Sequence, residues 1–401
     1  MLFATLGLAT SAMTLPGTAE LALLTVGSLL DGDGPRGDPT TVGTLAVVVP
    51  AHNEAAHVAA CVRSLRAAVA PPGGHRLVVI ADNCTDETAA LAREAGAEVI
   101  ERDDPDRRGK GYALERAFEH VLADPSVEAV LVVDADTSVE PNFLVAMASA
   151  FAGGADGVQC RYLVGNPDAS PRARLMNVAL LAFNVARPKA RERFGLSVGI
   201  LGNGFGLHRR VLEALPYTAR SVVEDLEYHL MMVRRGFRVR FVEATAVTAD
   251  VPVRSDAQAS QRARWEGGRY RMIREHAPAL VGEVARGRLR LLEPLGELLL
   301  LPLATHVGLL GVTLVIPYPP TQAYAAASLG LVGAHVLAAI KAGGGTAEDL
   351  SALARVPWYV VEKARMLPRL LAASKRGQAW IRTARDPAAG QDLAPEAAAP
   401  R

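Results

Sequence analysis

Hydrophobic and polar positions along the first third of the chain predict strands and helices in alternation. Apolar runs rich in β-branched residues have the pattern of strands that are buried on both faces of a sheet. These runs are residues 45–50, 77–80, 98–100 and 129–133. Amphipathic or alanine-rich stretches lie between them and predict helices at residues 55–69, 87–96 and 111–122. Strands that alternate with helices in this way indicate an α/β fold with a mostly parallel, Rossmann-like sheet.

Later in the chain, a long stretch without charge predicts helices in a membrane. No Asp, Glu, Lys or Arg occurs between Glu297 and Lys341, and Pro317-Tyr-Pro-Pro320 divides this stretch in two. Each half has the roughly 20 residues that a helix needs to cross a bilayer. We therefore predict a transmembrane hairpin over 298–341, preceded by a connecting, interfacial segment at 286–297. The alternative is a helical hairpin buried in a soluble domain.

The N-terminal region also carries a membrane signal. Residues 1–30 are apolar apart from Glu20, and the interruption at Leu15-Pro16-Gly17 predicts a kinked spanning helix. An interfacial helix is the alternative. Because the first basic residue is Arg36, we do not expect a cleaved signal peptide. Residues 31–44, rich in Gly, Asp and Pro, are expected to form a linker.

The C-terminal region mixes basic and apolar residues. Residues 350–385 have the composition of basic amphipathic helices that lie on an anionic leaflet, although a nucleic-acid patch is a competing interpretation. Positive charge marks the cytoplasmic side, so we expect a multi-pass protein of the cytoplasmic membrane with residues 45–285 facing the cytoplasm. Residues 386–401, rich in Ala and Pro, are predicted to be disordered.

Composition excludes several classes of protein. The formal net charge is +1, which gives no indication of a nucleic-acid partner. Three cysteines without a Cys-x-x-Cys pair predict neither a disulfide framework nor a zinc site. No Gly-x-Gly-x-x-Gly follows the first predicted strand and no Walker lysine motif occurs. Dinucleotide-dependent dehydrogenases and P-loop NTPases are therefore disfavoured.

Acidic residues follow three of the predicted strands. Glu54 comes after the first strand, Asp82 after the second, and Asp134 with Asp136 after the strand at 129–133. The carboxyl ends of parallel strands meet at one edge of the sheet, where ligands bind in open α/β folds. Two carboxylates one residue apart can share Mg²⁺ or Mn²⁺, whose shell is then completed by diphosphate oxygens. An isolated Asp-x-Asp is more often a polar loop or a helix cap, so the neighbouring motifs decide its meaning.

Two glycine-containing motifs and an acidic pair add candidate residues. Gly109-Lys110-Gly111 can bring a cation to a phosphate, and a solvated turn is the alternative. Gly202-Asn203-Gly204 allows either close backbone approach to a ligand or a tight turn. Glu224-Asp225 begins an apolar, helical stretch, where an acid can simply complement the helix dipole.

A further candidate motif lies on a predicted helix. At helical spacing Gln261, Arg264 and Trp265 share one face and combine an amide, a guanidinium and an indole. A guanidinium suits a diphosphate and an indole suits the apolar face of a sugar. An exposed basic helix with one anchoring Trp is the alternative.

In this order the motifs resemble the family 2 glycosyltransferases. The similarity is greatest to the membrane-bound branch with the D, D, D, QxxRW pattern, which includes cellulose, hyaluronan and poly-N-acetylglucosamine synthases and ceramide glucosyltransferases. The matching segments are Val48-Val-Pro-Ala-His-Asn-Glu54, Asp82-Asn-Cys-Thr-Asp86, Asp134-Ala-Asp136, Glu224-Asp225 and Gln261-Arg-Ala-Arg-Trp265. The resemblance covers residues 45–285 and implies a GT-A glycosyltransferase domain there. Val223 departs from the usual Thr, and His52 from the usual aromatic residue.

The resemblance also implies roles for individual residues. Asp225 matches the catalytic base, and Asp136 matches the ligand of Mg²⁺ or Mn²⁺. The residues expected to bind the nucleotide sugar are Pro50, His52, Glu54, Asp82, Lys110 and Asp134. The residues expected to face the diphosphate and acceptor are Gly202, Asn203, Glu224, Gln261, Arg264 and Trp265.

The expected activity is inverting transfer of a sugar from a nucleotide sugar, with UDP favoured by the resemblance, to a membrane-associated lipid or lipid-linked saccharide. Two or three spanning helices are few for a polymer channel, which favours a lipid acceptor. The main alternative is a subunit of a polysaccharide synthase that acts as a homo-oligomer or with an export partner. A nucleotidyltransferase and a catalytically inactive scaffold are further alternatives.

Overall fold

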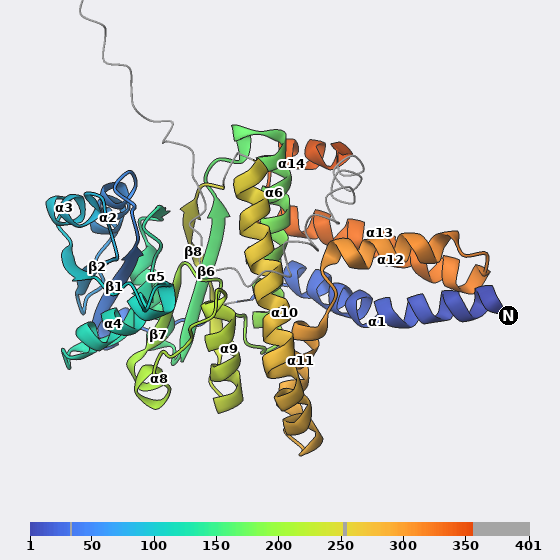
Figure 1. The fold of residues 1–401 in the computed structure, drawn as a ribbon, viewed down its shortest axis with the longest axis horizontal. Helices are drawn as coiled ribbons and strands as arrows, with labels where there is room; N and C mark the ends of the chain where they lie inside the picture. The colour runs from blue at the N-terminus through green and yellow to red at the C-terminus, as the bar shows by residue number, and fades with distance from the viewer. Residues whose placement is uncertain (33, 252–254, 356–401) are drawn as a thin grey trace, which may run out of the picture.

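The computed structural model places the predicted strands in one sheet and the predicted membrane segments in a helical bundle to one side of it (Figure 1). The structure describes residues 1–32, 34–251 and 255–355, apart from the side chains of residues 255–266. Within these residues the strands are β1 (Thr44–Ala51), β2 (His75–Asp82), β3 (Glu98–Arg102), β4 (Val127–Val132), β5 (Thr137–Val139), β6 (Gly157–Val164), β7 (Phe205–His208) and β8 (Val239–Ala249). The α-helices are α1 (Leu2–Leu29), α2 (Val58–Ala67), α3 (Thr88–Glu94), α4 (Lys110–Leu122), α5 (Phe143–Ala152), α6 (Pro171–Leu181), α7 (Arg187–Arg193), α8 (Arg209–Ala214), α9 (Glu224–Arg235), α10 (Ser255–Ala285), α11 (Leu292–Leu299), α12 (Leu303–Val315), α13 (Pro319–Ala342) and α14 (Ala347–Ala352).

The strand order across the sheet is β3-β2-β1-β4-β7-β6-β8-β5. β1 pairs in parallel with β2 and β4, and β2 pairs in parallel with β3, which confirms the predicted Rossmann-like arrangement. In the other half β7 is antiparallel to β4 and β6, β6 is parallel to β8, and β5 is antiparallel to β8. β5, β6 and β7 are absent from the sequence prediction because they are short or carry polar residues among the apolar ones.

β1 shows why the sheet is covered on both sides. Val47 and Val49 pack into the core cluster that includes α2 and α5, whereas Ala46 and Val48 pack into the cluster that includes α4, α8 and α9. All four side chains are fully buried. Because successive residues of a strand point to opposite faces, an uninterrupted apolar run fits a strand with helices on both sides.

The predicted membrane segments form a bundle of α1, α12 and α13 that projects away from the sheet (Figure 1). α1 has 28 residues and continues through Pro16, and α13 has 24. Among the described residues these are the two single helices long and apolar enough to cross a membrane. The Pro317–Pro320 motif does separate two helices, but α12 has only 13 residues. It forms a longer apolar stretch only together with residues Leu289–Leu299, at a bend of 76°.

The break before α12 corrects the expectation of a hairpin with two equal halves. Leu300 is extended at the end of α11, and Pro302 immediately precedes α12. Proline cannot donate a backbone hydrogen bond, so it favours the start of a new helix over continuation of the old one. Most of the predicted basic helices, from residue 356 to 385, and the predicted tail 386–401 lie outside the described residues.

Candidate functional site

The loop that follows β4 carries the Asp-x-Asp motif, and a turn before β7 is bonded to it. The backbone N–H of Asp134 donates to Asn203 Oδ1 (3.0 Å), and Asn203 Nδ2 donates to Thr137 Oγ1 (2.9 Å). Thr137 Oγ1 in turn donates to Asp136 Oδ1 (3.4 Å). Asn203 is only 1% exposed, so both ends of its amide are committed to this loop. Asn203 therefore ties the loop that carries both aspartates to the turn.

The turn requires glycine at both of its predicted glycine positions. Gly202 has φ +77° and Gly204 has φ +66°, which are conformations that other residues rarely adopt. A Cβ on Gly202 would lie 3.0 Å from Asp225 Oδ2. A Cβ on Gly204 would lie 2.7 Å from Cys160 Sγ. The motif is thus a tight turn whose backbone packs directly against the carboxylate of Asp225.

The side chain of Gln159 on β6 forms hydrogen bonds with the backbone of this turn. Gln159 is absent from the sequence prediction. Its Oε1 accepts from the backbone N–H of Leu201 (2.9 Å), and its Nε2 donates to the carbonyls of Asn203 (2.8 Å) and Gly204 (3.2 Å). The side chain is fully buried. A lone amide among the apolar residues of Gly157-Val-Gln-Cys160 is the signal that could have identified it.

Lys110, the first residue of α4, joins the acidic loop to the turn. Its Nζ donates to Asp134 Oδ1 and to the carbonyl of Gly202, both at 2.6 Å. Burial alone would lower the pKa of Lys110, but the carboxylates of Asp134, Glu224 and Asp225 outweigh that effect and raise it. The ammonium group therefore stays charged among the acids.

Glu224 and Asp225 occupy the first turn of α9. Burial raises the pKa of Glu224, and the neighbouring Asp225 raises it further, to about 7, against the opposing effect of Lys110. Burial also raises the pKa of Asp225, although the Leu226 N–H that donates to its Oδ1 (2.8 Å) and the charge of Lys110 oppose the rise. A carboxylate with a raised pKa is a stronger proton acceptor than one in water.

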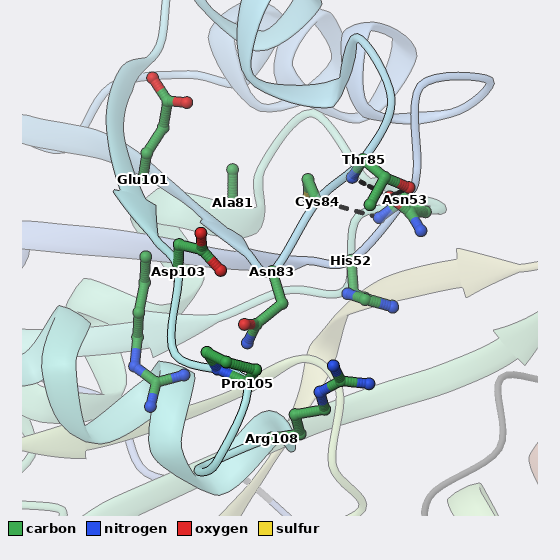
Figure 2. Close-up of a pocket in the computed structure, with 11 residues that line it drawn as sticks. His52, Asn53, Ala81, Asn83, Cys84, Thr85, Glu101, Asp103, Pro105 and Arg108 are labelled. Atoms are coloured by element: carbon green, nitrogen blue, oxygen red, sulfur yellow. Dashed lines mark hydrogen bonds between the residues drawn. The ribbon is translucent and has the colours of Figure 1, made fainter.

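A pocket of about 570 Å³ opens at the carboxyl ends of β1, β2 and β3. Figure 2 shows the side chains of His52, Asn83 and Arg108 pointing toward it from separate loops. Its lining residues are His52, Asn53, Ala81, Asn83, Cys84, Thr85, Glu101, Arg102, Asp103, Pro105 and Arg108. The volume is sufficient for a nucleoside, and it lies at the edge of the sheet where the sequence places nucleotide binding.

Of the predicted nucleotide-binding residues, His52 lines this pocket directly. Its Nδ1 donates to the backbone carbonyl of Asp82 (2.7 Å). The Asp82 carboxylate is buried and accepts from Arg102 Nη1 (2.5 Å), so it acts on the pocket through that arginine. Pro50 is the second-last residue of β1. Glu54 lies in the loop after that strand, and its backbone N–H donates to Thr88 Oγ1 (2.8 Å).

Two pocket residues that the sequence prediction did not include are Asn53 and Asn83. They have φ of +55° and +51°, respectively. Asn53 Oδ1 accepts from the backbone N–H of Thr85 (2.7 Å), which ties the loop after β1 to the loop after β2. Asparagine tolerates the left-handed region better than most residues, so an Asn just after each strand was a usable signal.

The carboxylates of the site can hold a hard divalent cation only if oxygen atoms of the substrate complete the coordination shell of the metal. Among the described residues no group of three or more His, Cys, Asp or Glu side chains is arranged to hold a metal. Asp136 is two residues after Asp134, which Lys110 contacts, and carboxylate oxygen is the ligand that Mg²⁺ and Mn²⁺ prefer. Residues 261–265 belong to α10, but the side chains of Gln261, Arg264 and Trp265 lie outside the described set.

Comparison with known proteins places the chain in a family. Residues 43–268 match the family described as glycosyltransferase like family 2. The probable glycosyltransferase YdaM of Bacillus subtilis is 22% identical over 238 residues, which are 57% of this chain and 56% of that protein. The beta-monoglucosyldiacylglycerol synthase of Synechocystis sp. is 26% identical over 243 residues, 58% of this chain and 50% of that one. The chain thus spans about half the length of these curated relatives.

A solved structure shares the fold over almost the whole chain. The mannosyltransferase PcManGT from Pyrobaculum calidifontis, in complex with GDP-Man and Mn²⁺, superposes with a TM-score of 0.54 at 20% identity. The match covers 93% of this chain and 97% of that one, which confirms the GT-A-like fold. The predicted family is confirmed as well, whereas the QxxRW branch stays a prediction. Because the match at residues 43–268 covers more than half of its length, the chain belongs to the family 2 glycosyltransferases.

Proposed function

We propose that this protein is an inverting, metal-dependent glycosyltransferase of the membrane surface that moves a sugar from a nucleotide sugar to a lipid or lipid-linked saccharide. The observation that carries the proposal is the convergence at Lys110. Its Nζ lies 2.6 Å from both Asp134 Oδ1 and the Gly202 carbonyl, and Gly202 packs against Asp225. A cation, an acidic loop and a candidate base therefore meet beside a pocket of nucleoside size.

The donor's nucleoside would occupy the pocket beside His52, with Pro50 and Glu54 at its rim. Asp82 would act through Arg102, whose guanidinium it holds at 2.5 Å. UDP is favoured by the resemblance to the QxxRW branch. A guanosine donor is the alternative, because the PcManGT structure of the same fold contains GDP-Man.

The diphosphate would extend from the pocket toward Asp134 and Asp136. Asp136 would hold Mg²⁺ or Mn²⁺, and the bound metal would supply positive charge to the departing nucleoside diphosphate. PcManGT was solved with Mn²⁺, which supports a divalent ion in this fold. Lys110 would add a second positive charge close to the β-phosphate, and Arg264 a third from α10. Stabilising developing charge with preplaced groups is a large part of such catalysis.

Asp225 would accept the proton of the acceptor hydroxyl as that oxygen attacks the anomeric carbon. The bond to the diphosphate breaks on the opposite side, so the anomeric configuration inverts. Positioned general bases contribute about 10²- to 10⁴-fold. Gly202 supports this role because any side chain there would lie against the Asp225 carboxylate. Glu224, Asn203, Gln261 and Trp265 would shape the space for the acceptor.

A lipid acceptor is supported by the membrane bundle. α1 and α13 could each cross a bilayer, and a relative that matches 58% of the chain is named as a monoglucosyldiacylglycerol synthase. We propose a multi-pass protein of the cytoplasmic membrane, with the sheet domain facing the cytoplasm. Polymer synthesis by an oligomer or with an export partner is the second candidate, which the resemblance to polysaccharide synthases favours.

A donor panel tests the proposal. The purified full chain in lipid vesicles is incubated with UDP-, GDP- and dTDP-sugars, with Mn²⁺, Mg²⁺ or EDTA, and release of the nucleoside diphosphate is measured. We expect one donor class to be turned over only with metal, and mass spectrometry to find the sugar on a lipid. No release from any donor, or release that is insensitive to EDTA, would count against the proposal, and a growing polymer would favour the second candidate.

A further inference from the structure

The segment that joins α10 to the membrane bundle exposes leucine on one side. It comprises η4 (Leu289–Leu291) and α11 (Leu292–Leu299). Leu289, Leu292 and Leu299 are 64%, 52% and 50% exposed. Their spacing of three and seven residues places them on one side of a helix, and we call them the leucine stripe. Such an aligned apolar surface is unfavourable in water and marks a contact with something apolar.

The other faces of this segment are already occupied. Leu291, Leu295 and Leu298 are buried in a cluster with Met272 and Leu280 of α10. The stripe is therefore the remaining apolar face, and it cannot turn inward without removing these three side chains from their core.

The acidic face of α11 is held by two arginines of α7. Arg191 Nη1 lies 2.7 Å from Glu297 Oε2, and further ion pairs join Arg191 to Glu293 and Arg187 to Glu297. Arg191 is 1% exposed, so these charges belong to the interior. Both carboxylates of α11 thus face the sheet domain, and the outward side keeps no negative charge.

Arg269 of α10 holds the end of the same helix. Its Nη2 donates to the carbonyls of Glu297 and Leu300, both at 2.7 Å. Both carbonyls lie at the C-terminal end of α11, where the backbone carbonyls of a helix have no N–H partner within the helix. α11 is therefore tied to α10, the helix whose earlier turns carry Gln261, Arg264 and Trp265.

The direction of the segment fits a membrane surface. Residues Leu289–Leu299 make an angle of 76° with α12, which packs against α13 in the bundle. Figure 1 shows α11 running across the end of the bundle. A helix that leads into a membrane bundle and is nearly perpendicular to its next helix has the direction of a helix lying along the interface of the bilayer.

Basic residues lie at the N-terminal end of the stripe. Arg286, Arg288 and Arg290 are exposed. Arg288 pairs with Glu283, whereas the described part of the chain provides no acidic partner for Arg286 or Arg290. A guanidinium binds phosphate in a bidentate manner, and basic residues next to an apolar helical face are typical of segments that bind anionic lipid.

We propose that the leucine stripe, together with Arg286 and Arg290, docks onto the anionic phospholipids of the leaflet that faces the sheet domain. The inference rests on the proposed membrane location of the protein. Continuity with the bundle favours lipid over a protein partner, because the stripe ends at Leu299, just before the chain enters α12 of the bundle. Docking there would hold α11, and through Arg269 also α10, at a fixed height on the bilayer.

Fluorescence quenching by lipid tests the docking. A fluorophore is attached to Leu289→Cys in a Cys84→Ala background, in which Cys61 and Cys160 are buried. The protein is reconstituted in phosphatidylcholine vesicles with or without 30% phosphatidylglycerol, and quenching by shallow spin-labelled lipids is recorded. Val69→Cys, at an exposed position (57%) after α2, is the matched control.

We expect strong quenching at position 289 in the anionic vesicles and none at position 69. The double variant Arg286→Gln, Arg290→Gln should lower the docked-to-free ratio by about fivefold for each arginine in anionic vesicles, with little change in neutral ones. Substituting the exposed Arg63 and Arg116 by Gln should have no such effect.

Absence of quenching at position 289 would overturn the proposal and indicate that protein covers the stripe. Equal quenching in both lipids, unchanged by the arginine variant, would overturn the role of the anionic headgroups. These readouts need no sugar transfer, so they stand apart from the test of activity. A failure of the protein to remain with the vesicles would instead contradict the proposed membrane location.

Discussion

Replacing Gln159 by Leu should disable catalysis while leaving donor binding nearly intact. The substitution keeps the approximate volume in β6 but removes the amide that organises the turn. The Leu201 N–H and the Asn203 carbonyl would lose their bonds to Gln159, at 2.9 and 2.8 Å. The Gly204 carbonyl would keep the bond from the Cys160 N–H (3.0 Å). The buried Asn203 carbonyl and the partly buried Leu201 N–H would thus be left without this partner.

The magnitude follows from those two groups. Each buried unpaired group costs about 1–3 kcal/mol, so the turn should shift rather than keep both in place. A displacement of about 1 Å in a catalytic group can cost about 100-fold in rate. We expect kcat to fall about 100-fold because Asn203 positions the metal loop and Gly202 contacts Asp225. The KM for the donor should change severalfold at most, because the pocket is built by the loops after β1, β2 and β3.

Steady-state release of the nucleoside diphosphate gives kcat and KM, and thermal unfolding gives the loss of stability. Leu65→Ala in α2 is the matched control, because Leu65 is 1% exposed and its truncation costs about 2–5 kcal/mol far from the turn. If Gln159→Leu lowers the thermal midpoint as this control does but leaves kcat unchanged, the reasoning about the turn is refuted.

Three further substitutions probe the same cluster. Gly202→Ala should lower kcat more than donor affinity, because the residue has φ +77° and its Cβ would lie 3.0 Å from Asp225 Oδ2; equal kcat in the variant would contradict this. Lys110→Gln should weaken binding of the nucleoside diphosphate at least tenfold, since it removes the positive charge proposed to contact the β-phosphate, about 1.5–3 kcal/mol; isothermal titration with the nucleoside diphosphate checks it. The pKa of Glu224 in the folded protein is raised to about 7. The stability that the protonated Glu224 side chain contributes to the folded state is therefore fully present below the pKa of this group in the unfolded chain, and it is lost as pH rises through 7. Glu224→Gln should therefore gain stability relative to wild type between pH 5 and pH 8, and a pH-independent difference in thermal midpoint would exclude that effect.

The parallel half of the sheet could be predicted because each of its strands is an uninterrupted apolar run closed by a polar loop. Val47 to Val49 bury alternate side chains on opposite faces, and this requires helices on both sides. β6 could not be predicted in the same way, because Gln159 and Arg161 interrupt its apolar sequence. Its place in the sheet depends on pairing with β7 and β8, which lie far away in the chain.

The site could be predicted as a set of residue types but not as a geometry. The chain order of Asp134, Lys110 and Asp225 says nothing about the bond from Lys110 to the Gly202 carbonyl. That contact needs the turn at Gly202, which in turn depends on Gln159. Similarly, the proline motif marked the end of α12 correctly, whereas the bend before Pro302 shortened that helix through backbone geometry that hydropathy does not report.

The central claim is that Asp225 is the base of a glycosyl transfer beside a metal-bound diphosphate. The most direct test compares wild type with Asp225→Asn for turnover of the cognate nucleotide sugar and for affinity toward its nucleoside diphosphate. Asp106→Asn, at an exposed position, serves as the control. We predict a loss of about 10²- to 10⁴-fold in kcat with donor affinity within about twofold of wild type. An Asp225→Asn variant that keeps wild-type turnover would contradict the account.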